Sequence, residues 1–310
     1  MDMRILNLTD ENLTLAARVL RSGGLIGLPT ETVYGLAADA ANDAAIARIY
    51  QAKGRPKFNP LIAHVSDVEM ALQEGIFSRD ALALVEKHWP GPLTVVVKVA
   101  PTGTVSELAR AGLDSVALRI PAHAIPIFLV REFGGPLVAP SANPSGKISP
   151  TTLQHVLDDM GEHIDLIFNG GTCAAGTEST IIDARGERPA LLRPGSLDPA
   201  WIEETWPDLM RPELNPNAPQ SPGQLLRHYA PKATLRLNAE AAEPGEAYLG
   251  FGEGPATLNL SERGDLEEAA KNLFSMLRTL DADYERIAVA PIPNIGLGEG
   301  INDRLTRAAK

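Results

Sequence analysis

The sequence has little of what defines several protein classes. Cys173 is the single cysteine among 310 residues, so the chain can build neither an internal disulfide framework nor a cysteine-based metal site. That usage fits a reducing compartment, and we expect a cytoplasmic protein. The chain does not open with a basic segment followed by an apolar one, so no signal peptide is predicted. No apolar run approaches the roughly 20 residues that span a bilayer, so we expect no membrane association.

Positive charge is also scarce. Lys and Arg number 28 against 39 Asp and Glu, which gives a net charge of −11 at pH 7. So acidic a molecule is poorly suited to general wrapping of nucleic acid or binding to an anionic membrane. The composition still leaves room for one small basic cleft.

The familiar catalytic signatures are absent as well. Gly146-Lys147 is followed by Ile148 and so does not complete a P-loop, and the glycines of 296–300 lack the spacing of a dinucleotide-binding loop. Neither H-E-x-x-H nor G-x-S-x-G occurs, and the six histidines are scattered without metal-ligand spacing. These absences argue against a zinc enzyme and against a serine hydrolase.

What is present is an alternation of short β-type runs and helical patterns. A length of 310 residues suits about two domains. Helices are predicted after Asp10, after Asp43, and after Ser149-Pro150 as far as Met160. Strands are predicted at 25–28, 61–65, 93–99, 116–120, 137–139, 166–168 and 180–183. The mixture predicts an α/β or α+β domain over residues 1–208, with a strand order that the sequence does not give.

The remaining third of the chain divides into a linker and a small unit. Residues 209–232 hold five prolines and three basic residues against one acidic residue, which predicts an extended, stiff linker. Residues 233–310 show strand patterns at 234–237, 247–251 and 286–290. An apolar helical stripe lies between the last two strands, over 266–277. We therefore expect a small C-terminal α/β domain.

Two polar clusters follow the first predicted strands. Residues 29–36, PTETVYGL, are either a ligand loop at a strand end or a hairpin-like turn. Residues 53–60, KGRPKFNP, place three cations within five positions, where they repel one another unless an anion sits among them. A polyphosphate suits this mixture of Lys and Arg, although a solvated helix end also favours cations.

Two further clusters lie in the middle of the chain. Arg119 stands inside an apolar strand pattern, so its guanidinium needs either a protein carboxylate or an anionic substrate as partner. Residues 139–149, APSANPSGKIS, follow a predicted strand with small and hydroxyl side chains. This loop either admits a ligand close to the backbone or serves helix capping by Ser149.

The last clusters are GTEST at 176–180, with Arg193 at a later turn, and the linker segment around His228-Tyr229. A linker that served only as a spacer would not need an aromatic and basic side chains together. Taken together, the clusters are rich in hydroxyls and cations and poor in metal ligands, with no evident nucleophile. This chemistry suits two anionic substrates that react with each other, with catalysis by positioning and charge neutralisation.

In this order the clusters resemble the YrdC-like family in its two-domain form. The resembling stretches are LPTETVYGLAADA, KGRPKFNPLIAHVSD, WPGPLTVVV, VALRIPAH, APSANPSGKISPT, GTESTIIDA, LLRPGSL, SPGQLLRHYAPKATL and GLGEGINDRLTRAA. The resemblance implies an open, twisted α/β sheet with helices around a positively charged cleft, and a small Rossmann-like C-terminal domain. It also implies a nucleotidyltransferase that condenses L-threonine, bicarbonate or CO2, and ATP to threonylcarbamoyl-AMP and pyrophosphate.

The resemblance assigns site residues by matching positions. L-Threonine would be bound by Thr32, His64, Arg119, Ala139 and Ser179. ATP would be bound by Lys53, Arg55, Asn59, Ser115, Ser141, Asn143, Ser149, Arg193 and Tyr229. Lys53 and Arg55 are the expected catalytic cations, magnesium is expected to enter with ATP, and no protein-ligated metal is expected. The linker would fold over the nucleotide as a lid.

The same resemblance implies partners in tRNA threonylcarbamoyladenosine modification. A separate tRNA threonylcarbamoyl transferase complex would consume the product, and a weak contact with tRNA is an expectation. Two alternatives from other classes stay open: an RNA-binding module that uses the basic cleft, which the net charge disfavours, and a carbamoyl-transfer domain of hydrogenase maturation. The sequence shows none of the accessory zinc-finger or acylphosphatase segments of the latter.

Overall fold

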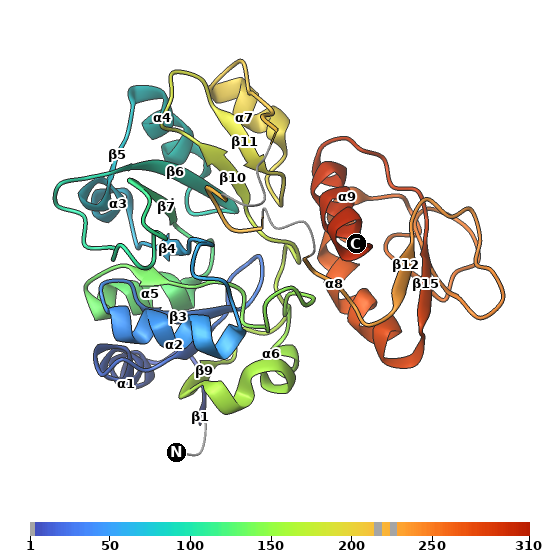
Figure 1. Cartoon of the computed structure of the whole chain (residues 1–310), viewed down its shortest axis with the longest axis horizontal. Coiled ribbons are helices and arrows are strands. Elements are labelled where there is room, and N and C mark those ends of the chain that lie inside the picture. Colours follow the sequence, from blue (N-terminus) through green and yellow to red (C-terminus); the bar gives the residue numbers. More distant parts are fainter. Residues whose placement is uncertain (1–3, 214–218, 224–227) are drawn as a thin grey trace.

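The structure is a computed structural model that describes residues 4–213, 219–223 and 228–310. Two units lie side by side, a larger one made by the first two thirds of the chain and a smaller one made by the C-terminal third (Figure 1). The expected linker comprises residues 209–232 of the sequence. Its residues 214–218 and 224–227 lie outside the described residues.

The larger unit is built on a mixed sheet, confirming the expected open α/β architecture. Within the described residues its strand order is β1-β9-β2-β3-β8-β4-β7-β6-β10-β11, with β5 paired to β6. The strands are β1 (Arg4–Leu6), β2 (Ile26–Leu28), β3 (Gly35–Asp39), β4 (Ile62–His64), β5 (Gly75–Ile76), β6 (Leu93–Val99), β7 (Ser115–Arg119), β8 (Leu137–Val138), β9 (Leu166–Phe168), β10 (Thr180–Asp183) and β11 (Ala190–Arg193).

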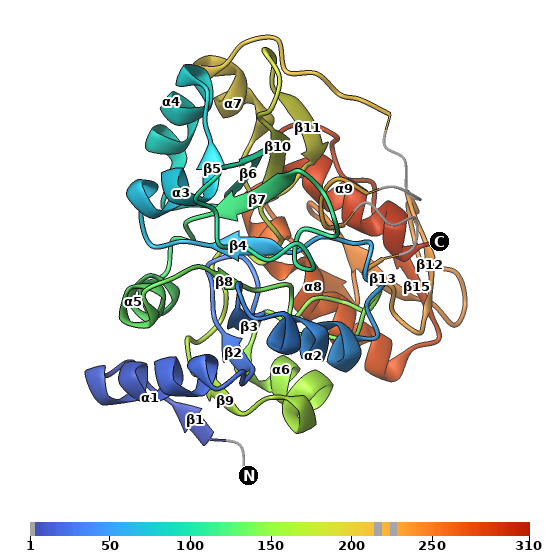
Figure 2. The same ribbon diagram turned by 60° about the vertical axis from the view of Figure 1, so that its left-hand side comes forward.

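Helices pack around this sheet and bury apolar faces against it (Figure 2). They are α1 (Asp10–Arg21), α2 (Asp43–Lys53), α3 (Val68–Glu74), α4 (Arg79–His88), α5 (Ala124–Phe133), α6 (Leu153–Met160) and α7 (Pro199–Thr205), with a 3₁₀ turn at Gly161–His163. In α1 the apolar residues at helical spacing are the buried ones, which is why this segment folds as an amphipathic helix. α2 ends at Gly54 with a φ of +58°, a left-handed conformation that glycine adopts without strain.

Two predicted helix starts were wrong by a few residues. The side chain of Thr9, not Asp10, caps α1 by accepting the backbone N–H of Asn12. The helix expected after Ser149-Pro150 begins at Leu153, and Thr152 caps it. Ser149 instead donates its hydroxyl to a side chain far along the sequence, Glu178.

The register of two central strands places charged side chains at one edge of the sheet. β4 and β7 run parallel, and His64 is paired with Arg119 at their carboxyl ends. β10 runs parallel to β6 and antiparallel to β11, where Ile181 pairs with Arg193. In open α/β sheets, ligands bind at the carboxyl ends of the strands.

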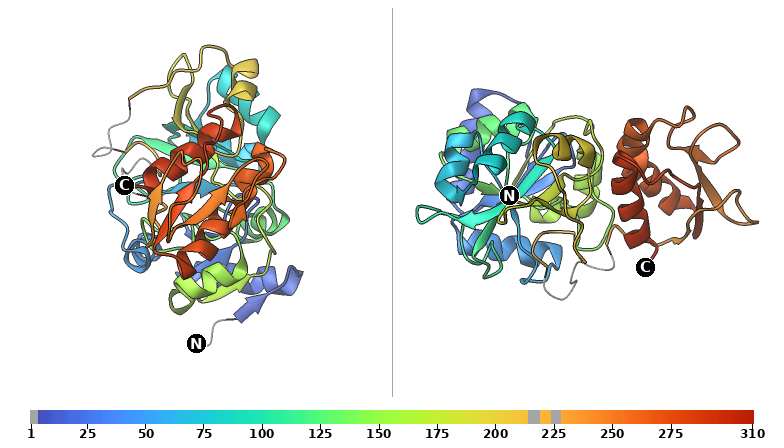
Figure 3. Two further views of the ribbon diagram at one scale, coloured as in Figure 1. Left: turned by 90° about the vertical axis from the view of Figure 1, so that its right-hand side faces the viewer. Right: turned by 90° about the horizontal axis from the view of Figure 1, so that it is seen from above.

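The smaller unit is a parallel sheet with helices on one side. Its strands, in the order β12-β15-β13-β14, are β12 (Thr234–Arg236), β15 (Arg286–Val289), β13 (Ala247–Gly250) and β14 (Leu258–Asn259). Its helices, α8 (Leu266–Asp283) and α9 (Leu297–Ala308), lie between this sheet and the larger unit (Figures 1 and 3). The expected Rossmann-like arrangement is thereby confirmed.

Two close approaches show how tightly the helices dock. A Cβ on Gly176 would come within 2.4 Å of the Lys271 carbonyl oxygen of α8. A Cβ on Gly300 of α9 would come within 3.0 Å of the Gly195 carbonyl oxygen. Gly298 and Gly300 therefore lie where backbone meets backbone, whereas Gly296 lies against the side chain of Asp198. None of the helices in the described part of the chain is both long and apolar enough to cross a membrane.

Candidate active site

A closed cavity of about 50 Å³ lies at the sheet edge where β4 and β7 end. The linker covers it from the side of the smaller unit. The lining residues are Thr32, Val33, Arg55, Ile62, His64, Arg119, Ala139, Pro140, Ser141, Glu178, Ser179, Arg193, Pro222, Gly223, His228 and Tyr229. Segments that lie far apart in the sequence thus meet at one point, which we call the central pocket.

Most of the residues that the family resemblance singled out meet there. The five expected threonine-binding residues, Thr32, His64, Arg119, Ala139 and Ser179, all line the central pocket. Of the expected ATP-binding residues, Arg55, Ser141, Arg193 and Tyr229 also line it, whereas Lys53, Asn59, Ser115, Asn143 and Ser149 do not. Ser115 starts β7, at the opposite end of that strand from Arg119.

Lys53 lies behind the pocket wall and supports it. Its ammonium group donates to the carbonyl oxygens of Ser141 at 2.6 Å and Asn143 at 2.5 Å. Burial, with a further contribution from Arg55, holds the pKa of Lys53 well below its usual value. In this structure the Lys53 side chain therefore positions the loop that carries Ser141.

Arg55 reaches the pocket itself. Its guanidinium donates to the carbonyl oxygens of Asn59 at 3.2 Å and Pro60 at 2.8 Å, so the turn that follows Arg55 fixes its direction. Burial lowers the pKa of Arg55 to about 10, which leaves it a cation at neutral pH. The Asn59 side-chain amide is buried and has no hydrogen-bond partner among the described residues.

Arg119 finds a protein carboxylate as partner. Its Nη2 lies 2.7 Å from Oε1 of Glu31, and both side chains are nearly buried. Nε donates to the Gly91 carbonyl oxygen at 3.3 Å. Of the two partners that the sequence left open for this arginine, the structure supplies the protein carboxylate, while Arg119 also faces the pocket. The segment 29–34, which carries Glu31, links β2 and β3, and these two strands pair as an antiparallel hairpin. The same segment also lines the pocket.

Another part of the pocket wall is a network around Ser179. The Ser179 hydroxyl lies 2.7 Å from that of Thr94, and Arg193 donates to the Ser179 carbonyl oxygen at 2.8 Å. Arg193 also donates to the Pro222 carbonyl oxygen of the linker at 3.4 Å. The side chain of Arg193 thus joins the sheet edge to the segment that covers the pocket.

The linker fills the space above these side chains. A Cβ on Gly223 would come within 2.8 Å of Arg193 Cδ. Tyr229, at a φ of +61°, stacks on Phe274 of α8 with 5.5 Å between ring centroids. A cavity of about 50 Å³ has room for a few water molecules but not for a nucleotide.

The pocket also holds polar groups that lack partners. The Tyr229 hydroxyl and the Nδ1 atoms of His64 and His228 are buried without a hydrogen bond among the described residues. Buried polar groups are normally satisfied, and such a concentration of exceptions at one cavity indicates a ligand site. With Arg55, Arg119 and Arg193 on its walls, the site is cationic although the molecule is acidic.

Sequence reasoning missed two charged residues of this region, Glu178 and Arg304. Glu178 lies on the pocket wall and accepts the Ser149 hydroxyl at 2.5 Å. Arg304 belongs to α9 and reaches Oε2 of Glu178. A signal was present in the sequence, because Arg304 shares the buried face of its helix with Ile301, Leu305 and Ala308, where a lone arginine needs a partner.

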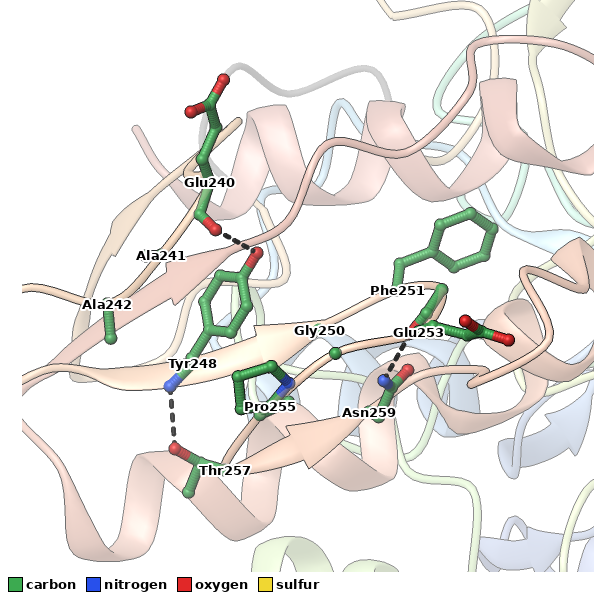
Figure 4. A pocket seen from close by; sticks show the side chains of 13 residues that line it. Glu240, Ala241, Ala242, Tyr248, Gly250, Phe251, Glu253, Pro255, Thr257 and Asn259 are labelled. Atoms are coloured by element: carbon green, nitrogen blue, oxygen red, sulfur yellow. Dashed lines mark hydrogen bonds between the residues drawn. The ribbon is translucent and has the colours of Figure 1, made fainter.

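A larger pocket, of about 480 Å³, lies in the smaller unit near the end of β13 (Figure 4). Its polar groups are engaged with one another: the Tyr248 hydroxyl donates to the carbonyl oxygens of Ala239 and Glu240, and Asn259 donates to that of Gly252. It contains none of the residues predicted for function. The smaller, cationic pocket is therefore the candidate active site.

His64 and His228 make the pocket sensitive to acid. Burial lowers the pKa of each to about 3, so both are neutral in the folded protein. Below pH 6.5 these two histidines are protonated in the unfolded chain but stay neutral in the folded chain. As the pH falls, the free energy of unfolding therefore decreases by about 1.4 kcal/mol per pH unit for each histidine. We expect the melting temperature to fall between pH 6.5 and 5, and to fall less in a His64→Gln variant.

The exposed His163 provides the control for this prediction. A His163→Gln variant should lose stability with the same pH slope as the unchanged protein. Equal slopes in the His64→Gln variant and the unchanged protein would contradict a neutral, buried His64.

Comparison with known proteins agrees with the geometry. Residues 18–195 match the family described as "Telomere recombination", and residues 198–310 match "Threonylcarbamoyl-AMP synthase, C-terminal domain". The threonylcarbamoyl-AMP synthase of Bacillus subtilis is 36% identical over 98% of this chain and 94% of its own length. That of Pyrococcus abyssi is 37% identical over 96% of this chain and 94% of its own length.

A solved structure extends the similarity to three dimensions. The crystal structure of P. abyssi Sua5 complexed with L-threonine has a TM-score of 0.92 and 34% identity, covering 100% of this chain and 98% of that one. The family resemblance inferred from the polar clusters is confirmed along the whole chain. By sequence and by fold, this chain belongs to the two-domain threonylcarbamoyl-AMP synthase family.

Proposed function

We infer that the chain catalyses the condensation of L-threonine, bicarbonate or CO2, and ATP to threonylcarbamoyl-AMP and pyrophosphate. The observation that carries this function is a single buried pocket in which Arg55, Arg119 and Arg193 meet hydroxyl side chains. Two anionic reactants need such a site, and the full-length relatives carry the name of this activity. The alternatives of an RNA-binding module and of a carbamoyl-transfer domain have no comparable support.

The threonine side of the pocket is the edge formed by β4 and β7. Arg119 would pair with the substrate carboxylate, and His64 beside it would stay neutral, because burial and then the charge of Arg119 hold its pKa near 3. Thr32, Ser179 and the backbone at Ala139 complete this side. The P. abyssi relative was crystallised with L-threonine, which supports an amino-acid site in this fold.

The ATP side is the opposite half, toward the linker. Arg55 and Arg193 would neutralise the phosphates, and Ser141 and Tyr229 would bound the nucleotide. Lys53 would act through the Ser141–Asn143 loop, whose carbonyl oxygens its ammonium group binds. Ser149 would act through Glu178, to which it donates its hydroxyl. Asn59 would act through Arg55, whose guanidinium it fixes. Direct contacts of Lys53, Asn59, Ser115, Asn143 and Ser149 with ATP stay predictions.

The chemistry needs position and charge neutralisation. The neutral amine of threonine attacks CO2 and loses a proton, giving a carbamate. A carbamate oxygen then attacks the α-phosphorus of ATP, the bond from that phosphorus to the bridging oxygen breaks, and pyrophosphate leaves. Negative charge grows on the leaving group, where Arg55 and Arg193 would stabilise it.

Magnesium would enter as part of the substrate MgATP. Among the described residues no group of three or more His, Cys, Asp or Glu side chains could hold a metal ion. Glu178 on the pocket wall is already engaged by Ser149 and Arg304. Phosphate and water oxygens, which Mg²⁺ prefers, would therefore be its main ligands.

The product is a reactive mixed anhydride, so a second protein should accept it. We propose a tRNA threonylcarbamoyl transferase complex as that partner, with only weak direct contact to tRNA. The net charge of −11 supports weak rather than tight tRNA binding.

Pyrophosphate release tests the function directly. The complete mixture of L-threonine, bicarbonate and MgATP should give pyrophosphate and a product with the mass of threonylcarbamoyl-AMP. Omission of threonine or of bicarbonate should abolish both. Pyrophosphate that forms equally without threonine, or an RNA affinity that falls with salt in the absence of turnover, would contradict the proposal.

Serine should be a poor but measurable substrate. It lacks only the methyl group of threonine, and one methyl group in a packed pocket gives a discrimination of about 10- to 200-fold. We expect kcat/KM for threonine to exceed that for serine within this range, measured by pyrophosphate release under identical conditions. Complete rejection of serine would mean that the pocket selects by more than packing against a methyl group.

A further inference from the structure

Arg304 is a cation of the smaller unit buried against the active site of the larger one. Its side chain is 0% exposed, and it is the bulkiest side chain among the fully buried ones of the described residues. Helix α9 brings it there because Gly300, one turn earlier on the same face, lets the helix backbone contact the Gly195 turn. A side chain at position 300 would crowd the Gly195 backbone against which α9 packs.

The guanidinium of Arg304 binds the pocket wall at two points. Its Nε donates to Oε2 of Glu178 at 2.9 Å, and its Nη1 donates to the Pro194 carbonyl oxygen at 2.5 Å. The other carboxylate oxygen of Glu178 accepts the Ser149 hydroxyl. One carboxylate thus connects Arg304 of α9 with Ser149, and Pro194 follows directly on the pocket residue Arg193.

The same guanidinium lies over the ring of Tyr229, with 5.3 Å between its carbon Cζ and the ring centroid. Tyr229 belongs to the linker and also stacks on Phe274 of α8, in the smaller unit. A buried cation over an aromatic face is an attractive contact, stronger where water is excluded. Arg304 therefore contacts both the wall of the pocket and the residue that covers it.

Charge balance adds a second consequence. Burial would raise the pKa of Glu178, but Arg304 and Arg193, with the hydrogen bond from Ser149, lower it overall. Without Arg304 the carboxylate would lose its closest cation and would draw Arg193 or take up a proton. Either change alters the cations available to an incoming triphosphate.

We propose that Arg304 is a positioning residue for the ATP side of the pocket. Through this residue the smaller unit holds Tyr229 and Glu178 in the arrangement that receives the nucleotide. This inference rests on the proposed function and goes beyond it, because it assigns a part in nucleotide handling to a residue that does not itself line the pocket.

The test separates ATP handling from threonine binding. An Arg304→Gln variant should lose at least tenfold in kcat/KM for ATP, measured by pyrophosphate release. Its Kd for L-threonine, measured by calorimetry without nucleotide, should stay within twofold of the unchanged enzyme. An Arg304→Lys variant keeps a positive charge near Glu178 but loses the planar guanidinium. Its kcat/KM for ATP should lie between those of the unchanged enzyme and the Arg304→Gln variant, and it can be tested if the Gln variant fails to fold.

Glu299 provides a matched control on the same helix. It pairs with Arg211 across the units at 2.5 Å, away from the pocket, and a Glu299→Gln variant should keep both parameters within twofold. Equal losses in the Glu299 and Arg304 variants would overturn the proposal and reduce Arg304 to a docking contact. Unchanged kinetics in both Arg304 variants would also overturn it. The same holds if the Kd for threonine rises by the same factor by which kcat/KM for ATP falls. An unchanged enzyme that releases no pyrophosphate would instead refute the proposed function.

Discussion

An Arg119→Gln enzyme should need at least 100-fold more L-threonine for half-maximal pyrophosphate release than the unchanged enzyme. In the proposed function Arg119, which lines the central pocket, pairs with the threonine carboxylate, and an α-carboxylate that loses a buried, charge-assisted partner loses more than a surface ion pair would. A factor of 100 corresponds to about 2.8 kcal/mol. Saturation curves for threonine at fixed MgATP measure the effect.

The partner of Arg119 has to be considered in that experiment. Glu31, 2.7 Å away, would be left as a buried carboxylate without a cation, and breaking such a pair destabilises a protein by about 3–5 kcal/mol. The double variant Glu31→Gln with Arg119→Gln removes both charges and should fold more stably, yet should still fail to bind threonine. Arg48→Gln, which breaks a partly exposed pair with Asp165, is the control and should leave the threonine requirement unchanged. If the double variant uses threonine normally, the carboxylate of the substrate does not pair with Arg119.

An Arg55→Gln enzyme should lose at least 100-fold in kcat, with little change in threonine affinity. Arg55 lines the pocket, and in the proposed function it neutralises the negative charge that grows on departing pyrophosphate, so its loss should act on the transition state more than on binding of the amino acid. Single-turnover measurement of pyrophosphate release reports the chemical step. Calorimetry with threonine alone reports binding.

Lys57 is the matched control for Arg55. It belongs to the same cationic cluster two residues further on, but its side chain is exposed and lies outside the pocket. A Lys57→Gln enzyme should keep at least half of its turnover. If Lys57→Gln and Arg55→Gln enzymes lose turnover to the same extent, general attraction of ATP by the cluster would replace the specific role of Arg55.

The family resemblance named most of the residues that line the pocket, and strand positions explain why several of them meet. His64 ends one such run and Arg119 ends another, and parallel pairing of β4 with β7 puts them in register. Arg193, at the end of β11, reaches Ser179 because β11 runs antiparallel to β10, which begins directly after Ser179. Strand order was not predictable, because short apolar runs specify burial but not which neighbour each strand pairs with.

What the sequence could not give were contacts between residues that lie far apart in the chain. Ser149 looked like a local helix cap, but Glu178, 29 residues away, takes its hydroxyl, and Thr152 caps the helix. Lys53 looked like a phosphate ligand, but two backbone carbonyls receive its ammonium in this structure. Arg304 acquires its partners only when α9 packs on the Gly195 turn.

A crystal structure with L-threonine and a non-hydrolysable ATP analogue bound together tests the central claim most directly. The account predicts the threonine carboxylate within hydrogen-bond distance of Arg119 and the triphosphate between Arg55 and Arg193, with the linker displaced to make room. Either ligand bound outside this pocket, or the two ligands bound in separate cavities, would contradict it.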